Sequence, residues 1–500
     1  MNANLNKVLM PTVIVLSLLL GASGMYVGMN VWSNGDVTPV IEQTDGDNGQ
    51  ESTDESYGEE TPTPAILDEN IEKFSTAFDL ILDRYVEEVD SSKLLEGAIS
   101  GMLETLDDPY SVYMDEVTAR EFMESLDSSF EGIGAEVSMT NGKVTIVAPF
   151  RDSPAEDAGL RPNDQVIKVD GEDIEGLSLY EAVLKIRGEK GTVVTLTIER
   201  PGVNDLLEFD VVRDTIPIET VYSDLVEENG KKIGVIELRS FSENTAERFE
   251  EELLSFEEQG IDGLIIDVRG NPGGFLQSVE DIGDLIIPGG EPVVQIENRN
   301  GDRMRHISSL EDTRSYPIVG LINEGSASAS EILAAALIEA GGYDVVGKTT
   351  FGKGTVQQTL RMDDGSEIKL TLYKWLTSAG NYINEVGVEP TVEVAQPEFF
   401  YVSPIVVNEG ESLTEDVTSE HVRNAQIMLS GLGFDPGRED GYFSDETASA
   451  VREFQSDVGI DVTGDIDRDT AERLQTELVN VIQDREYDYQ FKKAVELLVE

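Results

Sequence analysis

Residues 323–331 (NEGSASASE) carry three serines between an apolar run, 317–322, and an Ala-rich stretch. A serine at a strand-to-helix junction can act as a nucleophile, because the free N–H groups and partial positive charge of a helix N-terminus stabilise an oxyanion. The same residue types also cap helices, with Glu331 placed three residues after Ser328 as in a capping box. Taken alone, the segment fits either acyl-transfer chemistry or helix capping.

A second segment, 351–358 (FGKGTVQQ), holds Lys353 between two glycines. Glycine lets the backbone approach its neighbours closely, so this lysine can lie deep in a cleft. Burial disfavours the ammonium form, and a neutral lysine can act as general base toward a serine. A phosphate-binding loop is the alternative, but the segment lacks the G-x-x-x-x-G-K-[ST] pattern and Thr355 is misplaced for it.

A third segment, 267–274 (DVRGNPGG), follows the apolar run GLII. Gly273 and Gly274 can aim backbone N–H groups at a developing negative charge. The alternative is a tight turn between a strand and a helix, which uses the same residue types.

In this order, the three segments resemble those of the C-terminal processing peptidases, a family of serine proteases, and residues 106–114 (LDDPYSVYM) resemble that family's N-terminal signature. The resemblance implies that Ser328 is the nucleophile, Lys353 the general base and Gln357 the residue that orients the lysine. The backbone groups that it assigns to the oxyanion hole are the N–H of Ala329 and that of Gly273 or Gly274.

An inserted β-rich segment resembles a PDZ domain, through a Gly-Ile-Gly-Ala loop that opens a strand and through 153–171 (SPAEDAGLRPNDQVIKVDG). The resemblance implies that the loop N–H groups bind a peptide's terminal carboxylate and that the peptide adds as a strand at the sheet edge. It also implies an apolar pocket lined by Ile133, Ala135 and Val137. Arg187, at the end of a predicted helix, either pairs with an acidic group or is solvated. The four loop residues are Gly132, Ile133, Gly134 and Ala135.

Residues 418–481 resemble a small three-helix peptidoglycan-binding domain, through LGF at 432–434 and DGYF at 440–443. Most of the matching residues are of core and turn types, so the resemblance indicates the fold more strongly than the ligand. Peptidoglycan is the ligand that it implies.

The composition excludes several other functions. Acidic residues number 99 against 36 basic ones, and a formal net charge of −63 repels nucleic-acid backbones, so no nucleic-acid partner is expected. The absence of cysteine excludes thiol catalysis and Cys-ligated metals, and two histidines cannot build a multi-His site. We therefore expect no metal and no cofactor. His306 and His421 lie in no triad-like pattern and are expected at the surface.

Residues 8–31 are uncharged and mostly apolar, long enough at about 1.5 Å per residue to span a bilayer core of about 30 Å. Lys7 precedes this run and the next basic residue is Lys73, which predicts an N-terminus inside and the rest of the chain at the extracytoplasmic face of the membrane. A signal peptide cleaved near 22–24 is the alternative, and would give a secreted protein. We favour the uncleaved anchor because the run continues past this site.

Strands alternate with helices from 232 to 394, which predicts an α/β layer structure. The expected fold is multidomain, α/β and α+β: an α/β protease core with an inserted β-rich PDZ domain, a three-helix peptidoglycan-binding-like domain and an N-terminal transmembrane helix. The expected segments are a membrane anchor or signal segment (1–32), an acidic disordered linker (33–64), an N-terminal helical part of the protease (65–128), the PDZ domain (129–214), the protease core (215–400), the peptidoglycan-binding-like domain (412–481) and a C-terminal helix (482–500).

Together with the N-terminal apolar run, the resemblances imply an exported serine endopeptidase that recognises accessible C-terminal tails of protein substrates through its PDZ domain and cleaves by a Ser-Lys mechanism. The resemblance also implies a homodimer, and the N-terminal run implies attachment to a membrane. A catalytically silent PDZ scaffold is one alternative, against which the intact Ser328, Lys353 and Gln357 argue. A cell-wall-targeted hydrolase is the other, but no zinc, cysteine or paired-carboxylate motif of such enzymes is found.

Overall fold

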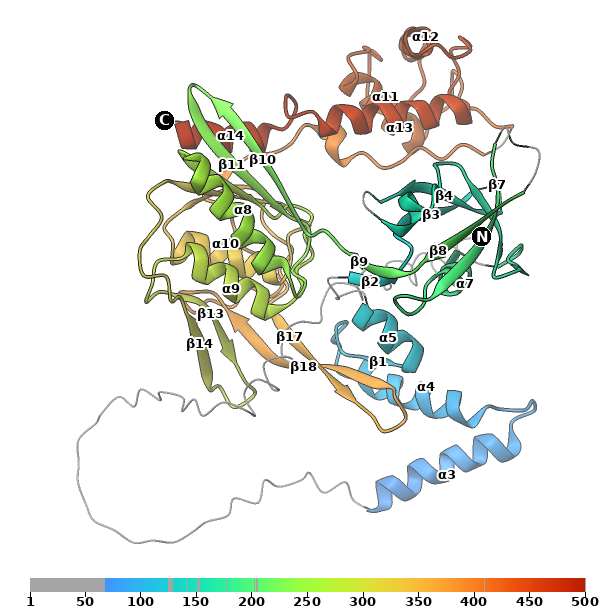
Figure 1. The fold of residues 1–500 in the computed structure, drawn as a ribbon, viewed down its shortest axis with the longest axis vertical. Helices are drawn as coiled ribbons and strands as arrows, with labels where there is room; N and C mark the ends of the chain where they lie inside the picture. The colour runs from blue at the N-terminus through green and yellow to red at the C-terminus, as the bar shows by residue number, and fades with distance from the viewer. Residues whose placement is uncertain are drawn as a thin grey trace.

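The computed structural model describes residues 68–124, 129–140, 142–150, 153–177, 179–201, 203, 206–408 and 410–499. The predicted membrane anchor (1–32) and acidic linker (33–64) lie outside these residues. Among the helices that the structure describes, none is long and apolar enough to cross a membrane. Figure 1 shows an N-terminal helical part, a β-rich domain, a central α/β body and a C-terminal helical domain.

The N-terminal part contains one strand in addition to its helices. Its elements are α3 (Asp68–Arg84), α4 (Ser91–Glu104), β1 (Val112–Met114) and α5 (Glu116–Glu124). The side chain of Asp90 caps α4 by accepting hydrogen bonds from backbone N–H groups of its first turn. β1 pairs antiparallel with β18 (Glu367–Leu376), so the segment predicted as helical, 65–128, adds a strand to the protease.

The β-rich domain is an antiparallel sheet of order β3-β4-β5-β7-β8, with β6 paired to β5, around its own apolar core. Its elements are β3 (Ala135–Thr140), β4 (Lys143–Pro149), α6 (Pro154–Asp157), β5 (Gln165–Val169), β6 (Glu172–Asp173), α7 (Leu179–Ile186), β7 (Val193–Glu199) and β8 (Leu207–Val212). β2 (Ser129–Gly132) and β9 (Asp214–Pro217) pair with each other outside this sheet and form a ribbon that leads to the protease.

The central body is built on a six-stranded sheet of order β10-β11-β12-β15-β16-β19, parallel from β11 onward. Its strands are β10 (Val221–Glu228), β11 (Lys231–Leu238), β12 (Gly263–Asp267), β15 (Ile318–Ile322), β16 (Asp344–Gly347) and β19 (Val392–Glu393). β15, and β12 up to its last residue Asp267, are continuously apolar because both faces of the sheet are covered. Leu264 and Ile266 face one core and Ile265 the other.

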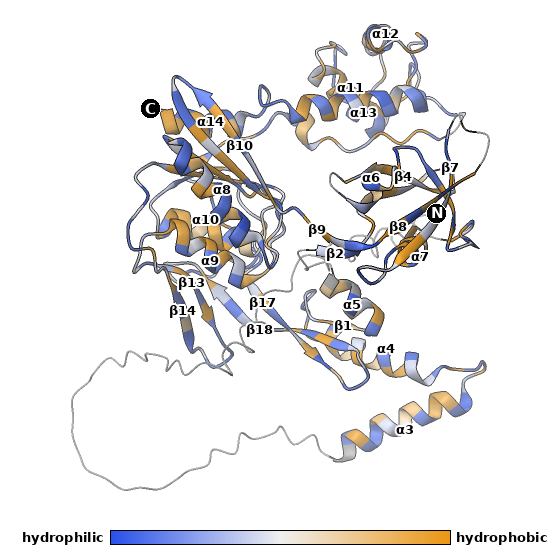
Figure 2. Cartoon of the chain, viewed as in Figure 1, coloured by the Kyte–Doolittle hydropathy of each residue, from blue (hydrophilic) through white to orange (hydrophobic). Residues whose placement is uncertain are grey.

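Four helices cover the two faces of this sheet: α8 (Thr245–Gln259), α9 (Leu276–Ile286) and α10 (Ala329–Glu339) on one, and α14 (Tyr489–Val499) on the other. α10 is buried over nearly its whole length, and Figure 2 shows it among the most apolar helices of the body. The predicted C-terminal helix is thus part of the protease body.

A second sheet of order β1-β18-β13-β14, with β17 paired to the other edge of β18, lies beside the first. Its remaining strands are β13 (Pro292–Glu297), β14 (Arg303–Ile307) and β17 (Thr355–Arg361). β18 therefore has β17 along one side and β1 and β13 along the other.

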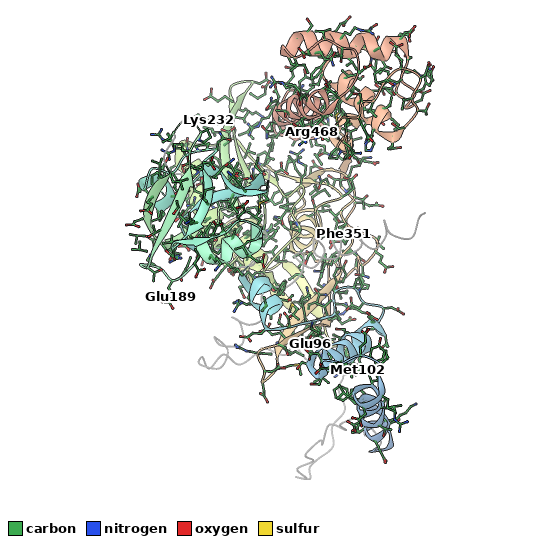
Figure 3. The ribbon with its side chains drawn as sticks, turned by 90° about the vertical axis from the view of Figure 1, so that its right-hand side faces the viewer. Glu96, Met102, Glu189, Lys232, Phe351 and Arg468 are labelled. Carbon is green, nitrogen blue, oxygen red and sulfur yellow. The ribbon has the colours of Figure 1, made fainter. Side chains whose placement is uncertain are left out.

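The C-terminal domain has three packed helices, as predicted: α11 (Glu420–Gly431), α12 (Asp445–Val458) and α13 (Arg468–Gln483), preceded by the 3₁₀ turn η1 (Glu398–Tyr401). Its core is separate from those of the protease. Figure 3 shows it, with Arg468, at the opposite end of the molecule from the helix that carries Glu96 and Met102.

Candidate active site

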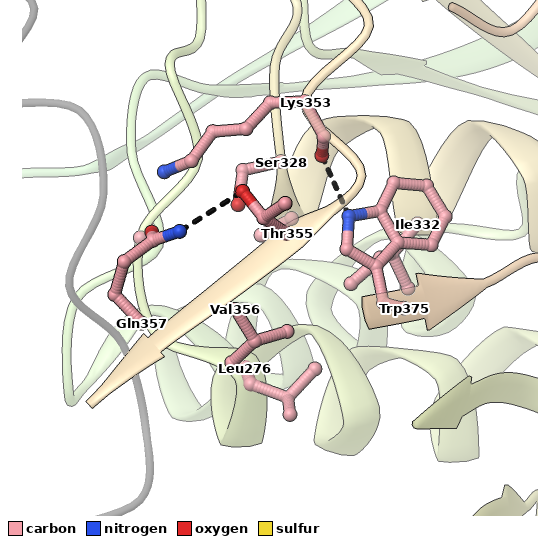
Figure 4. A pocket seen from close by; sticks show the side chains of 10 residues that line it. Leu276, Ser328, Ile332, Lys353, Thr355, Val356, Gln357 and Trp375 are labelled. Carbon is pink, nitrogen blue, oxygen red and sulfur yellow. Dashed lines mark hydrogen bonds between the residues drawn. The ribbon is translucent and has the colours of Figure 1, made fainter. Parts of the chain in front are cut away.

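The three predicted segments meet in one pocket. They follow β12, β15 and β16, and the carboxyl ends of parallel strands lie at the same edge of a sheet. Figure 4 shows the side chain of Lys353 extending past Ser328 toward the amide of Gln357. The predicted site residues that line the pocket are Gly274, Ser328, Ala329, Lys353 and Gln357.

Ser328 has a strained backbone, with φ 55° and ψ −114°. A non-glycine residue at positive φ is uncommon, and such strain is typical of a nucleophile on a sharp strand-to-helix turn. The carbonyl of Ser328 accepts hydrogen bonds from the N–H groups of Glu331 (2.9 Å) and Ile332 (3.0 Å), which start α10. The turn therefore holds the backbone of Ser328 while its side chain lines the pocket.

The two neighbouring serines are engaged elsewhere. The hydroxyl of Ser326 donates to the carbonyl of Val268 at 2.8 Å, and that of Ser330 to the carbonyl of Asn271 at 2.9 Å. Both serines are fully buried. Their hydroxyls tie the serine-bearing loop to the glycine-bearing loop, and Ser328 is the serine of the three that lines the pocket.

The two glycines of the 273–274 pair differ in what their N–H groups do. The N–H of Gly273 donates to Oδ1 of Asn271 at 2.8 Å. For the N–H groups of Gly274 and Ala329, no acceptor is found among the described residues. At Gly274, with φ 146°, a Cβ atom would lie 2.0 Å from the carbonyl oxygen of Phe241, so only glycine fits. Of the two glycines, the geometry thus favours Gly274 as the partner of Ala329 in the predicted oxyanion hole.

Contacts of the backbone at Lys353 and Gly354 hold this lysine in place. Its carbonyl accepts a hydrogen bond from the indole N–H of Trp375 at 2.6 Å. At Gly354, a Cβ atom would lie 2.8 Å from the backbone nitrogen of Asn384, so glycine permits the close approach that buries the lysine. Only 1% of Lys353 is exposed.

This environment favours the neutral amine. Burial lowers the pKa of Lys353 to about 7, and the nearby charge of Lys369 lowers it as well, while Glu331 and Asp108 act in the opposite direction. The Nζ atom lies 4.8 Å from the centre of the Tyr110 ring. A large fraction of Lys353 is therefore neutral near neutral pH and able to accept a proton.

The orientation of the Gln357 amide is fixed by two threonines. Its Nε2 donates to Oγ1 of Thr355 and to Oγ1 of Thr371, each at 2.9 Å. An amide nitrogen has two hydrogens, so both are used. The carbonyl oxygen is the part of this amide that is left for another partner.

Glu331 has a larger part in the site than the sequence indicated. Its buried carboxylate accepts hydrogen bonds from the N–H groups of Ser328 (2.8 Å), Gly352 (2.7 Å) and Lys353 (2.8 Å), and from the hydroxyl of Thr350 (2.6 Å). Burial raises the pKa of Glu331, and these donors oppose that rise. One carboxylate thus joins the serine and lysine segments, a role for which the capping-box spacing was the only signal.

Hydrogen bonds fix the backbone of the predicted carboxylate loop of the PDZ domain at Gly134. The carbonyl of Gly134 accepts from the N–H of Phe150 and from the hydroxyl of Ser153, both at 2.8 Å. Gly134 has φ 74°, and a Cβ atom there would lie 2.5 Å from that of Ser153. The loop therefore needs glycine at this position.

The apolar pocket predicted beside this loop stays a prediction, and its three expected lining residues pack against the core of the domain. The side chain of Ile133 is 4% exposed and packs in the core of the domain. Ala135 and Val137 are half-buried against the same core. Gly132 belongs to the β2–β9 ribbon, and the guanidinium of Arg187 lies 4.7 Å from the ring of Phe130.

Neither histidine lines the pocket. His306 is half-buried rather than a simple surface residue, with Nε2 3.2 Å from Oδ1 of Asp284 and Nδ1 3.8 Å from Oε2 of Glu280. His421 lies in the C-terminal domain, on α11. No histidine can therefore serve Ser328 as its base.

Four family descriptions match the chain: Peptidase family S41 over 232–394, PDZ domain over 125–199, putative peptidoglycan binding domain over 418–474, and activating protease CtpB N-terminal domain over 18–118. The chain is 47% identical to the carboxy-terminal processing protease CtpB of Bacillus subtilis over 99% of both chains. It is 40% identical to CtpA of the same organism, over 86% of this chain and 91% of that one.

Among solved structures, a photosystem II D1 C-terminal processing protease is 27% identical, over 64% of this chain and 92% of that one, with a TM-score of 0.39. The family match and the site together define a serine-type peptidase with a PDZ domain and a peptidoglycan-binding-type domain. The chain belongs to peptidase family S41, among the carboxy-terminal processing proteases.

Proposed function

We propose that this peptidase cleaves exported proteins after binding their C-terminal tails, with Ser328 as nucleophile and Lys353 as general base. The observation that carries the proposal is the shared pocket of Ser328 and a buried Lys353 whose pKa is about 7. The neutral amine takes the proton of the Ser328 hydroxyl as the oxygen attacks the scissile carbonyl. The resulting ammonium then gives that proton to the leaving amine.

The N–H groups of Gly274 and Ala329 form the oxyanion hole in this mechanism. Both belong to the pocket, and Ala329 begins α10, whose N-terminus adds a partial positive charge. Gln357 orients the lysine through its carbonyl oxygen, because its two N–H groups are held by threonines. Water hydrolyses the acyl-enzyme in a second passage through the same groups.

The PDZ domain supplies tail recognition in this proposal. A peptide terminus would meet the loop 132–135 and add along β3, which lies at the edge of the domain's sheet. The names of the relatives, carboxy-terminal processing proteases, describe the same preference.

The remaining parts of the chain bear on location. We place the enzyme at the extracytoplasmic face of a membrane, anchored or released through residues 8–31, because this run is apolar and positive charge precedes it. The C-terminal three-helix domain would bind peptidoglycan, as its family description indicates. Assembly as a homodimer belongs to the same proposal.

The test is cleavage of a peptide with a free C-terminus, followed by mass spectrometry. Ser328→Ala should abolish cleavage, and Lys353→Arg should be nearly as inactive, because arginine stays charged and cannot accept the proton. His306→Ala and His421→Ala serve as folded controls that retain most activity. Cleavage by Ser328→Ala or Lys353→Arg, or its loss in a folded His306→Ala variant, would overturn the mechanism.

A further inference from the structure

The N-terminal signature, 106–114, reaches the active site although it precedes the protease core by more than a hundred residues. Ser111 is 5% exposed, and its hydroxyl oxygen accepts a hydrogen bond from the backbone N–H of Thr371 at 3.0 Å. The same hydroxyl donates to Oδ2 of Asp108 at 2.6 Å. Ser111 is therefore oriented by its own turn and bonded to β18.

Thr371 links this turn to the catalytic segment. It pairs with Gln357 across β17 and β18, at a bulge that separates the pair Val356 and Tyr373 from the pair Gln357 and Thr371. Its Oγ1 accepts from Nε2 of Gln357 at 2.9 Å, while its backbone N–H donates to Ser111. The pairing of β1 with β18 extends only to Val112 and Lys369, so beyond it a side chain supplies the acceptor for the N–H of Thr371.

We propose that Ser111 is a positioning residue of the peptidase, which acts on Gln357 through Thr371. The proposal rests on the role of Gln357 given above. Without the Ser111 hydroxyl, the N–H of Thr371 loses its acceptor and β18 can shift at the bulge. The threonine hydroxyl then no longer holds the Gln357 amide, and the carbonyl oxygen turns away from Lys353.

The same turn also contacts the lysine itself. The N–H of Tyr110 donates to Oδ1 of Asp108 at 3.0 Å, so the carboxylate that orients Ser111 also holds Tyr110. The ring of Tyr110 lies 4.8 Å from Nζ of Lys353. One turn of the N-terminal part thus touches both Lys353 and the support of Gln357, which makes the N-terminal part a component of the active site.

The first measurement compares Ser111→Ala with Ser366→Ala in the full chain. Ser366 is also buried, on the far end of the same hairpin, and its hydroxyl donates to Asp364 at 2.6 Å as that of Ser111 does to Asp108. Ser111→Ala should lower kcat about tenfold with KM within about twofold, since one hydrogen bond in the support of the base is lost. Ser366→Ala should leave both constants unchanged. An unchanged kcat in Ser111→Ala, or an equal loss in both variants, overturns the proposal.

A double-mutant cycle distinguishes positioning from simple stabilisation. In a Gln357→Ala background, Ser111→Ala should have no further effect on the rate at which a fluorophosphonate probe labels the enzyme, because the group through which it acts is gone. A full tenfold further loss would show that Ser111 acts independently of Gln357 and would refute the proposal.

A second pair of variants is decisive where a Ser111 variant fails to fold or Gln357→Ala labels too slowly. Thr371→Val removes the hydroxyl that holds Gln357 and should lower kcat about tenfold, whereas Thr371→Ser should retain it. Equal activity of the two Thr371 variants contradicts the proposal. Cleavage by Ser328→Ala would instead refute the proposed nucleophile. The ratio of kcat between Thr371→Val and Thr371→Ser would still test the role of the threonine hydroxyl on its own.

Discussion

Replacing Lys353 by methionine should abolish cleavage and at the same time stabilise the fold. A lysine whose pKa is about 7 in the folded protein and 10.5 when unfolded binds more protons in the unfolded state. Folding is therefore penalised below pH 7, and the penalty is removed as the pH rises from 7 to 10.5. Linkage gives a penalty of about 4 kcal/mol at pH 7 and about 2 kcal/mol at pH 9.

The pH dependence separates this electrostatic effect from any change in packing. Methionine does not titrate, so the gain in unfolding free energy of Lys353→Met over the parent should shrink by about 2 kcal/mol between pH 7 and pH 9. A packing change would instead alter the unfolding free energy by the same amount at pH 7 and at pH 9. Trp375, which is fully buried and bonded to the carbonyl of Lys353, reports local unfolding by its fluorescence.

Denaturant unfolding would be followed in a Ser328→Ala background, where self-cleavage is absent. Lys374→Met is the matched control, because this lysine lies on the adjacent strand β18 and is exposed. Its replacement should change the unfolding free energy by less than about 0.5 kcal/mol at either pH. A stability difference for Lys353→Met that stays constant or widens from pH 7 to pH 9 would refute the assignment of Lys353 as a neutral base.

Two further predictions concern the electrostatics of the base and the recognition of tails. Lys369→Met removes a positive charge that lowers the pKa of Lys353, so the pKa of Lys353 should rise. The increase of kcat/KM with pH should then occur at higher pH in a pH–rate profile. A shift of this increase to lower pH would contradict the prediction. Amidation of a substrate peptide's C-terminus should weaken its binding to the catalytically inactive Ser328→Ala variant, measured by titration calorimetry, because the loop N–H groups no longer meet a carboxylate. Equal affinity for acid and amide would exclude tail reading by the PDZ domain.

The order of the parts and the pocket were predictable from the sequence, because each motif follows an apolar run and strand ends meet at one edge of a sheet. The choice between Gly273 and Gly274 was not predictable. It depends on the side chain of Asn271, whose Oδ1 accepts a hydrogen bond from the N–H of Gly273. Two consecutive glycines allow several turn conformations, so the sequence does not specify the one in which this bond forms. Local sequence could not show which N–H is left.

β1 was missed for a related reason. Three residues, Val112–Met114, are too few for a period of two to be recognised, and their pairing partner lies some 250 positions later in the chain. The burial of Ile133 was missed because a residue between two glycines can point to either side of the loop. In both cases a contact distant in sequence decides the structure.

The two interpretations of residues 323–331, acyl-transfer chemistry and helix capping, are compatible, because both involve Glu331. The carboxylate of Glu331 accepts the N–H of Ser328, as in a capping box, and the same carboxylate accepts the N–H of Lys353. A carboxylate that only capped the N-terminus of the helix would need the bond from Ser328 alone and would leave its other oxygen to solvent. Here burial forces both oxygens to find donors, and the donors available are those of Gly352, Lys353 and Thr350. The carboxylate of Glu331, in the first turn of α10, therefore also ties the backbone of Ser328 to that of Lys353, and the same contact that caps the helix brings together the proposed nucleophile and base.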